Sequence, residues 1–377
     1  MFRHPPLALV MLLLSFPQIV ETIYSPALPL IASAYRATPE EAAQTLSLWF
    51  VAFALGVVGW GRLCDLIGRR PALLAGLALY ALGAGWALIA TAFPHLLIAR
   101  LLSAFGAAVG SIVTQTSLRD SYRGTELSRV FALLGLALAV SPAIGMLLGQ
   151  AISSHAGHRG LFAGLGLLAI ALFALSLAFW PETRPAEIPP QRFLPTVRDM
   201  SRDGQIWRNA VLIAAFNLAI FGYYQLGPFL FERLENRWLE FGQSGLVLAA
   251  ASLLGAYANS RLLRRGKSPG QIVGYGVLLL TLGALLVTLL ASGPAFLIGT
   301  AIVALAYAIA IPNILAEALR NYADRLGTAG AILSLLYYTL LGLGLAIAGW
   351  GQRLDLLLLA CAMLAALAIR RPSGADR

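Results

Sequence analysis

Charged residues are scarce in this chain of 377 residues: Asp, Glu, Lys and Arg make up 12%, against 59% hydrophobic residues and a mean hydropathy of +0.78. A soluble domain cannot bury that much apolar surface in its own interior. The composition therefore excludes a soluble globular protein and predicts that a lipid bilayer is the chain's solvent. The net charge of +10 does not predict binding to nucleic acid, because the basic residues occur singly between apolar runs.

Cysteine and histidine are scarcer still. Cys64 and Cys361 form neither a disulfide framework nor a metal-ligand spacing. His155 and His158 lie in an expected outer loop with no third ligand nearby, so we expect solvated loop histidines and no metal site.

Lysine occurs once, at Lys267 in the tripeptide Gly266-Lys267-Ser268. The upstream glycine that a phosphate-binding loop requires is replaced by Arg261. No nucleotide site follows, so we expect no cofactor and no enzyme, and a process driven by an ion gradient or by the gradient of a solute.

Long hydrophobic runs, by contrast, are abundant. A window of about 20 residues per membrane span predicts an all-α integral membrane protein with twelve transmembrane helices. A proline-rich polar gap divides them into a bundle within 1–180, a linker at 181–207 and a second six-helix bundle within 208–377, which is the plan of two parallel bundles. The expected spans are 7–31, 42–64, 71–92, 95–117, 127–151, 160–180, 208–231, 242–263, 271–292, 295–318, 328–350 and 353–370.

The positions of the basic residues predict the orientation. If the N-terminus is cytoplasmic, 21 of the 27 basic residues fall in inner segments, which satisfies the positive-inside rule. We therefore expect a multi-pass protein of a bacterial inner membrane with both termini in the cytoplasm. The exceptions are Arg100 within a helix and five outer residues, Arg36, Arg159, Arg233, Arg237 and Arg353.

The segment Gly61-Arg62-Leu63-Cys64-Asp65-Leu66-Ile67-Gly68-Arg69-Arg70-Pro71 lies between the second and third spans. It resembles the loop motif GxxxDxxGR[RK] of the major facilitator superfamily. Gly61 would let another helix approach closely, and Asp65 would cap a neighbouring helix N-terminus and lock the cytoplasmic side. Gly68 completes the motif, and Arg69 and Arg70 would anchor the loop at the inner surface.

Two charges are expected inside the membrane, where they are costly and therefore indicate function. Glu21 lies about 21 Å from the inner edge of a roughly 30 Å hydrocarbon core. Arg100 lies roughly 8 Å from the outer edge, so the two depths coincide. One interpretation makes Glu21 a proton acceptor tuned by Arg100 and by burial. The alternative is a static buried ion pair that fixes helix packing.

Further segments narrow the resemblance to drug:proton antiporters of the bicyclomycin/chloramphenicol-resistance type. They are Tyr24-Ser25-Pro26-Ala27-Leu28-Pro29 in the first helix, Ala99-Arg100-Leu101-Leu102-Ser103 in the fourth and Ser141-Pro142-Ala143-Ile144-Gly145 in the fifth. That family usually has an aspartate two residues before the tyrosine, where this chain has Thr22, with Glu21 one residue earlier.

The resemblance also implies a direction of transport. Pro142 removes a backbone hydrogen bond, and Gly145 and Gly149 give a flat face for close helix packing. In the family this pattern is associated with antiporters and implies export, whereas ordinary small-residue packing is the alternative explanation.

Polar residues in expected helices are candidates for binding a substrate. They suit moderately polar, neutral or cationic organic molecules, such as a drug, a siderophore or a metabolite, or else they bond between helices. We expect a monomer that binds this small molecule, protons and lipid. The candidates are Tyr24, Gln115, Asn217, Tyr224, Gln225, Asn313 and Tyr337.

Two other functions stay open at this point. A proton-coupled importer or a uniporter of the same fold would share these features except the pattern in the fifth helix. A non-transporting membrane sensor would not need two charges at matched depth.

Overall fold

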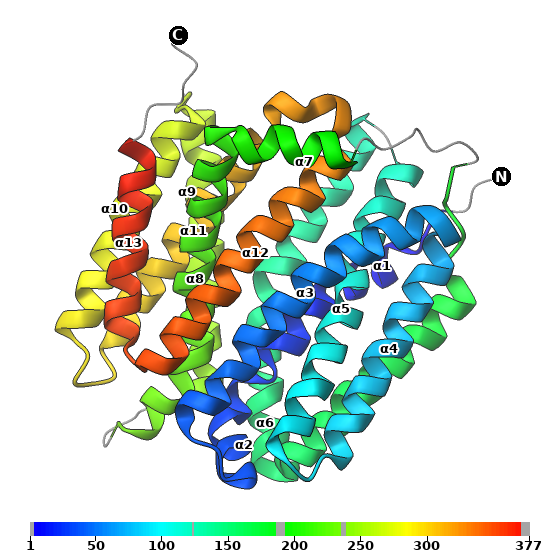
Figure 1. The fold of residues 1–377 in the computed structure, drawn as a ribbon. Helices are drawn as coiled ribbons and strands as arrows, with labels where there is room; N and C mark the ends of the chain where they lie inside the picture. Colours follow the sequence, from blue (N-terminus) through cyan, green and yellow to red (C-terminus); the bar gives the residue numbers. More distant parts are fainter. Residues whose placement is uncertain (1–3, 123, 186–192, 235–238, 371–377) are drawn as a thin grey trace. The chain divides into compact units, whose positions relative to one another are not determined.

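The computed structural model describes residues 4–122, 124–185, 193–234 and 239–370. Arg237 and part of the expected linker, 186–192, lie outside the described residues. The described chain is helical without strands, and its contacts divide it into two units, Met1–Pro190 and Gln191–Arg377 (Figure 1).

The first unit contains six membrane-length helices. Its first helix is broken by prolines into α1 (Leu7–Thr22), a 3₁₀ turn η1 (Ser25–Ala27) and α2 (Leu28–Tyr35). Then follow α3 (Pro39–Ile67), α4 (Arg69–Ile89), α5 (Phe93–Ser121) and α6 (Gly124–Phe179). α6 joins the two expected spans 127–151 and 160–180 across a kink at Gly157, whose φ is 66°.

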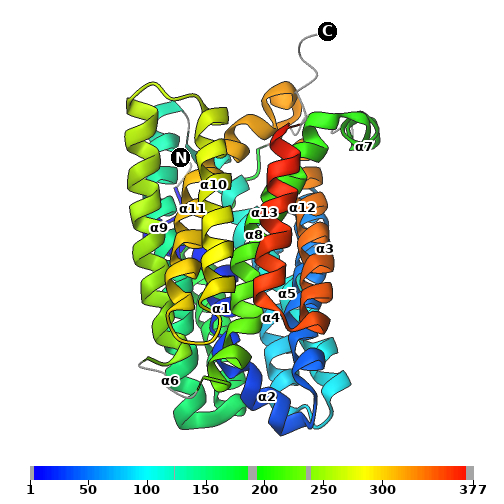
Figure 2. The ribbon, with the colours of Figure 1, turned by 90° about the vertical axis from the view of Figure 1, so that its left-hand side faces the viewer.

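The second unit begins with a short helix, α7 (Phe193–Arg202), inside the stretch that the sequence predicts to be a linker. α7 lies crosswise at the ends of α8 and α12 (Figures 1 and 2). The six long helices are α8 (Gly204–Glu232), α9 (Phe241–Arg264), α10 (Pro269–Leu289), α11 (Phe296–Ala318), α12 (Leu326–Gly351) and α13 (Leu354–Arg370), with a 3₁₀ segment η2 (Arg320–Arg325) before α12.

Ten helices in the described chain are long and apolar enough to span a membrane. The kink in α6 divides one of them into two spans, and α13, with 17 residues, adds the last. The twelve-helix all-α fold predicted from hydropathy is therefore confirmed.

Local signals in the sequence explain where several helices begin. Thr38 caps α3: its hydroxyl accepts from the Glu41 N–H at 3.2 Å, and the Glu41 carboxylate accepts from the Thr38 N–H at 2.8 Å. Ser268 and Gln271 form the same capping box at α10. These caps satisfy backbone donors that a helix start otherwise leaves unpaired.

Small residues hold the helices of each unit together. A Cβ atom on Gly106 of α5 would lie 2.6 Å from the Tyr80 nitrogen of α4, so only glycine allows this separation. Gly56 of α3 is equally restricted, since its Cβ would lie 2.7 Å from the Phe105 carbonyl oxygen of α5. Close backbone approach is the usual basis of helix association in lipid, where the hydrophobic effect does not drive packing.

Candidate functional site

Glu21 lies in the last turn of α1, where the proline-rich sequence ends the helix. Its side chain is only 2% exposed, and one carboxylate oxygen, Oε1, has no hydrogen-bond partner among the described residues. A buried carboxylate without a partner is costly, and it is the kind of group that a transporter retains for function.

Arg100 of α5 lies within electrostatic reach of Glu21 but forms no hydrogen bond or ion pair with it in the described chain. The guanidinium carbon lies instead 3.9 Å from the ring centre of Tyr24 and 4.2 Å from that of Trp49. The Nε and Nη2 donors have no hydrogen-bond partner among the described residues. A static ion pair, the alternative considered for these two charges, is therefore absent there.

Aromatic side chains surround this charge, and all of them are buried. Tyr80 of α4 packs edge-on against Trp49 at 6.4 Å and against Phe16 at 4.8 Å between ring centres. Tyr24, which the sequence predicts to contact substrate, is itself buried beneath Arg100. Trp49 and Tyr80 were not singled out from the sequence, because an aromatic residue in an apolar run usually indicates only core packing.

The loop between α3 and α4 contains a second cluster of charges. Arg69 bonds Asp65 at 2.6 Å, Asp120 at 2.8 Å and the Cys64 carbonyl oxygen at 3.0 Å. Both ion pairs are largely buried, and they join α3, α4 and α5. Capping of another helix by Asp65 stays a prediction.

Glu182, which follows α6, completes this loop and was missed in the sequence. Its carboxylate accepts from the backbone N–H groups of Arg69 at 2.9 Å, Arg70 at 3.1 Å, Thr183 at 3.0 Å and Arg184 at 2.9 Å. It thereby caps the N-terminus of α4, where negative charge is favoured.

Gly68 lies against the Glu182 carboxylate, and the neighbouring arginines bond to the ends of two helices. Gly68 has φ 106°, and a Cβ there would lie 2.5 Å from Glu182 Oε2, so both conformation and space require glycine. Arg70 donates to the Leu177 carbonyl oxygen, and Arg184 donates to the Leu66 carbonyl oxygen at 3.1 Å. The arginines thus tie the ends of α3 and α6 to the loop.

Of the glycines expected to allow close helix packing, Gly145 and Gly149 do so and Gly61 does not do so within the first unit. A Cβ on Gly145 would lie 2.9 Å from the Ile19 carbonyl oxygen of α1, and one on Gly149 would lie 2.9 Å from the carbonyl carbon of Ile23, the residue that follows α1. Both glycines of α6, in which Pro142 also lies, therefore pack closely on the end of the first helix. Among the described residues of the first unit no helix approaches Gly61 unusually closely, so its expected role stays a prediction. Its Cβ would lie an ordinary 3.6 Å from Ile112, because Gly56 provides the close contact between α3 and α5.

Two amides in the second unit bond between helices. The Tyr307 hydroxyl of α11 donates to Asn217 Oδ1 of α8 at 3.3 Å, and Asn313 Nδ2 of α11 donates to Asn259 Oδ1 of α9 at 2.8 Å. Of the two roles considered for these amides, the structure shows helix-to-helix bonding. Tyr307 was missed in the sequence.

The other candidates for substrate contact lie apart from these pairs. Gln225 is fully buried, Tyr224 packs against Phe221 and Tyr223, and Tyr337 packs against Tyr338 at 4.3 Å between ring centres. Gln115 of α5 is half-buried and donates to the Ser111 hydroxyl at 3.2 Å. Their contact with substrate stays a prediction.

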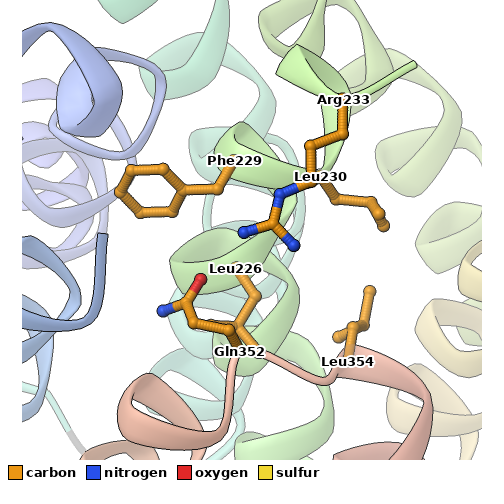
Figure 3. A pocket seen from close by; sticks show the side chains of 6 residues that line it. All are labelled: Leu226, Phe229, Leu230, Arg233, Gln352 and Leu354. Atoms are coloured by element: carbon orange, nitrogen blue, oxygen red, sulfur yellow. The ribbon is translucent and has the colours of Figure 1, made fainter. Parts of the chain in front are cut away.

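A small pocket in the second unit lies at the C-terminal end of α8, where Leu226, Phe229, Leu230 and Arg233 meet Gln352 and Leu354 (Figure 3). Arg233 is exposed and Gln352 half-buried. The Arg233 side chain in this pocket can be hydrated at little cost, so it does not indicate a functional charge as the buried Arg100 does.

Comparison with known proteins agrees with a fold of twelve helices in two units. Residues 10–349 match the sequence model of the Major Facilitator Superfamily. The chain belongs to the Major Facilitator Superfamily. The superfamily match and the transporter relatives identify a multi-pass membrane transporter and not an enzyme.

Curated relatives include an uncharacterized transporter of Rickettsia bellii, 31% identical across 89% of this chain and 87% of the relative. A chloramphenicol resistance protein of Pseudomonas aeruginosa is 31% identical across 90% of this chain and 83% of the relative. Multidrug resistance protein D of Escherichia coli is 27% identical across 52% of this chain and 49% of the relative. The resemblance to drug-resistance transporters drawn from the motifs is thus confirmed.

Solved structures share the fold. A crystal structure of the POT family transporter PepTSo has a TM-score of 0.80 at 11% identity, covering 96% of each chain. A bacterial homologue of the human lysosomal transporter Spinster has a TM-score of 0.73 at 14% identity, covering 96% of this chain and 94% of the other.

Proposed function

We propose that this transporter exports a small organic molecule in exchange for protons, by alternating access. The buried, unpartnered carboxylate of Glu21 beside the buried charge of Arg100 carries this proposal. A carboxyl group in this position can take up a proton when open to one side of the membrane and release it on the other side.

Competition between proton and substrate provides the coupling. A substrate that binds more tightly when Glu21 is ionised favours release of the proton, and by linkage a proton favours release of the substrate. Export follows if substrate enters from the cytoplasm and the proton enters from outside.

The substrate class is supported by relatives named for resistance to chloramphenicol and to multiple drugs. We propose moderately polar, neutral or cationic organic molecules, with a drug, a siderophore or a metabolite as the candidates. Tyr24, Gln115, Tyr224, Gln225 and Tyr337 are the proposed contacts, since their polar or aromatic groups lie among apolar helices.

We further propose that the protein is a monomer in a bacterial inner membrane with both termini in the cytoplasm. The distribution of its arginines supports this orientation, and the proton gradient takes the place of a cofactor. Labelling of single cysteines at either terminus, in intact cells and in broken cells, tests the orientation.

The decisive experiment uses Glu21→Gln, which fixes the neutral form of the side chain. We expect chloramphenicol transport driven by an imposed pH gradient in proteoliposomes to be lost, while binding of chloramphenicol persists and loses its pH dependence. The matched control is Glu126→Gln, the same change at an exposed position in the first turn of α6.

Full gradient-driven transport by Glu21→Gln would contradict the proposed coupling and would favour a uniporter. Accumulation of substrate in the direction of proton entry would instead indicate an importer on the same fold.

A further inference from the structure

Arg100 is oriented by aromatic rings and not by an acidic partner. Tyr24 and Trp49, which we term the aromatic clamp, lie with their ring centres 3.9 and 4.2 Å from the guanidinium carbon. A cation over a ring face is attracted by the ring quadrupole, and the attraction is greatest where water is excluded. Arg100 is 2% exposed, so the clamp acts under those conditions.

Trp49 is itself held in place from a third helix. Its ring contacts Tyr80 of α4 edge-on, and Tyr80 contacts Phe16 of α1. Trp49 on α3 and Tyr80 are at most 1% exposed, so the Trp49 ring cannot turn away from Arg100 without disturbing the packing of the first unit.

The second unit provides an internal comparison, because its helices repeat the register of the first. Gly83 of α4 packs on Ala99 and Ser103 of α5, and Gly283 of α10 packs on Gly299 and Val303 of α11. Gly56 of α3 packs on Phe105 and Ala108, and Gly255 of α9 packs on Leu305 and Ala308.

In that register Arg100 corresponds to Thr300, Trp49 to Leu248 and Tyr80 to Leu280. The copy that lacks the arginine also lacks the rings of Trp49 and Tyr80, although Leu248 and Leu280 are as buried as their counterparts. Packing alone is therefore satisfied by leucine at these two positions, and Trp49 and Tyr80 accompany the charge.

We propose that Trp49 is a positioning residue for proton exchange at Glu21: with Tyr24 it holds the Arg100 guanidinium out of a direct ion pair with the Glu21 carboxylate. The proposal rests on the proposed function of Glu21. A direct ion pair would hold Glu21 ionised and impede proton uptake, whereas the clamp keeps the positive charge near without that bond.

Few charged or titratable groups other than Arg100 can influence the titration of Glu21. In the described chain Arg100 interacts electrostatically with Glu21 on α1, with Tyr24 at the start of η1 and with Tyr80 on α4, and Arg100 is the charged group that acts on Glu21. A change in the clamp should therefore appear in the titration of Glu21.

The test measures that titration without a substrate. Infrared spectra of the purified protein across pH should contain a protonated-carboxyl band that Glu21→Gln removes, and this band would report the midpoint of Glu21. In Trp49→Leu, which copies the second unit, the freed guanidinium can pair with Glu21, so we expect the midpoint to fall by about one pH unit. Trp49→Phe retains a ring face and should keep the wild-type midpoint.

Trp60→Leu is the matched control. It makes the same change on the same helix, and it also removes the hydrogen bond from Trp60 Nε1 to the Phe105 carbonyl oxygen at 2.8 Å. The Trp60 ring, however, is not one of the rings that contact Arg100 in the described chain. Its midpoint should equal that of the wild type. If Trp49→Leu does not fold, Tyr24→Leu compared with Tyr24→Phe makes the same comparison from the other ring.

An unchanged midpoint in Trp49→Leu, or an equal shift in Trp49→Phe or Trp60→Leu, would overturn the clamp. That result would leave the proposed function standing if Glu21→Gln still abolishes gradient-driven transport. Retention of transport by Glu21→Gln would instead overturn the proposed function.

Discussion

At the scale of single residues, Glu182 shows how one carboxylate can organise a loop. Three of its four backbone hydrogen bonds go to Oε1 and one, from Arg70, goes to Oε2. Two of the four donors are the first N–H groups of α4, which have no partner within the helix. The carboxylate replaces those partners and adds a charge that the helix dipole favours.

Glu182→Gln should therefore destabilise the first unit. The amide oxygen can keep the bonds to Oε1, but the amide NH₂ group would face the Arg70 N–H, donor against donor. We expect a loss of roughly 1–3 kcal/mol of unfolding free energy, measured as a lower melting temperature of the purified protein in detergent. Equal melting of Glu182→Gln and the exposed control Glu126→Gln would show that the loop is held by its arginines.

Residue-level prediction from the sequence succeeded where a side chain is costly in lipid. Glu21 and Arg100 are both buried, as two charges inside helices at one depth had indicated. The partners of Arg100 could not be predicted, because aromatic residues are ordinary in apolar helices and a ring contact across three helices leaves no spacing in the sequence. Glu182 was missed for a related reason, since the α4 backbone groups that it caps, those of Arg69 and Arg70, lie more than a hundred residues away in the sequence.

At the scale of helices, the interface between α4 and α5 depends on one face of glycines. A Cβ on Gly83 would lie 2.8 Å from the Ser103 nitrogen and 2.9 Å from the Ala99 carbonyl oxygen, whereas a Cβ on Gly85, two residues later, meets no atom within 4 Å. The corresponding residue of the second unit, Leu285, is exposed, which shows that a large side chain fits at this position.

Gly83→Val should force α4 and α5 apart and cost roughly 1–3 kcal/mol. Gly85→Val is its control, since it adds the same β-branched side chain to the same helix without a neighbour to displace. Size-exclusion profiles and melting curves should distinguish the two. The packing interpretation fails if Gly85→Val is the more damaging change.

The helices themselves were predictable from hydropathy because a bilayer requires long apolar runs. Expected and observed ends agree within a few residues, for example 242–263 against Phe241–Arg264. The sequence did not predict α7, since ten residues with mixed charges give no membrane signal. Its buried face, Thr196 and Met200, becomes apparent only when packed on the second unit.

At the scale of the whole molecule, we propose that the loop cluster of Asp65, Arg69 and Asp120 controls the change between access states. Asp65→Asn removes one of the two carboxylates that neutralise Arg69. We expect transport to fall roughly fivefold through a shift in the population of access states. Labelling of cysteines placed at the inner and outer mouths would report the shift, and an unchanged labelling pattern would remove Asp65 from the gate.

The shared register of the two units also bears on the history of the chain. Glycines at matching positions in α3, α4 and α5 and in α9, α10 and α11 are what two descendants of one duplicated ancestor would retain, because a misplaced side chain there prevents packing. Since the copies differ instead at Arg100, Trp49 and Tyr80, evolution was free to specialise one half around a buried charge while the other kept uncharged side chains at these positions. A chimaera built from two copies of the second half should therefore assemble in the membrane and yet ignore a proton gradient.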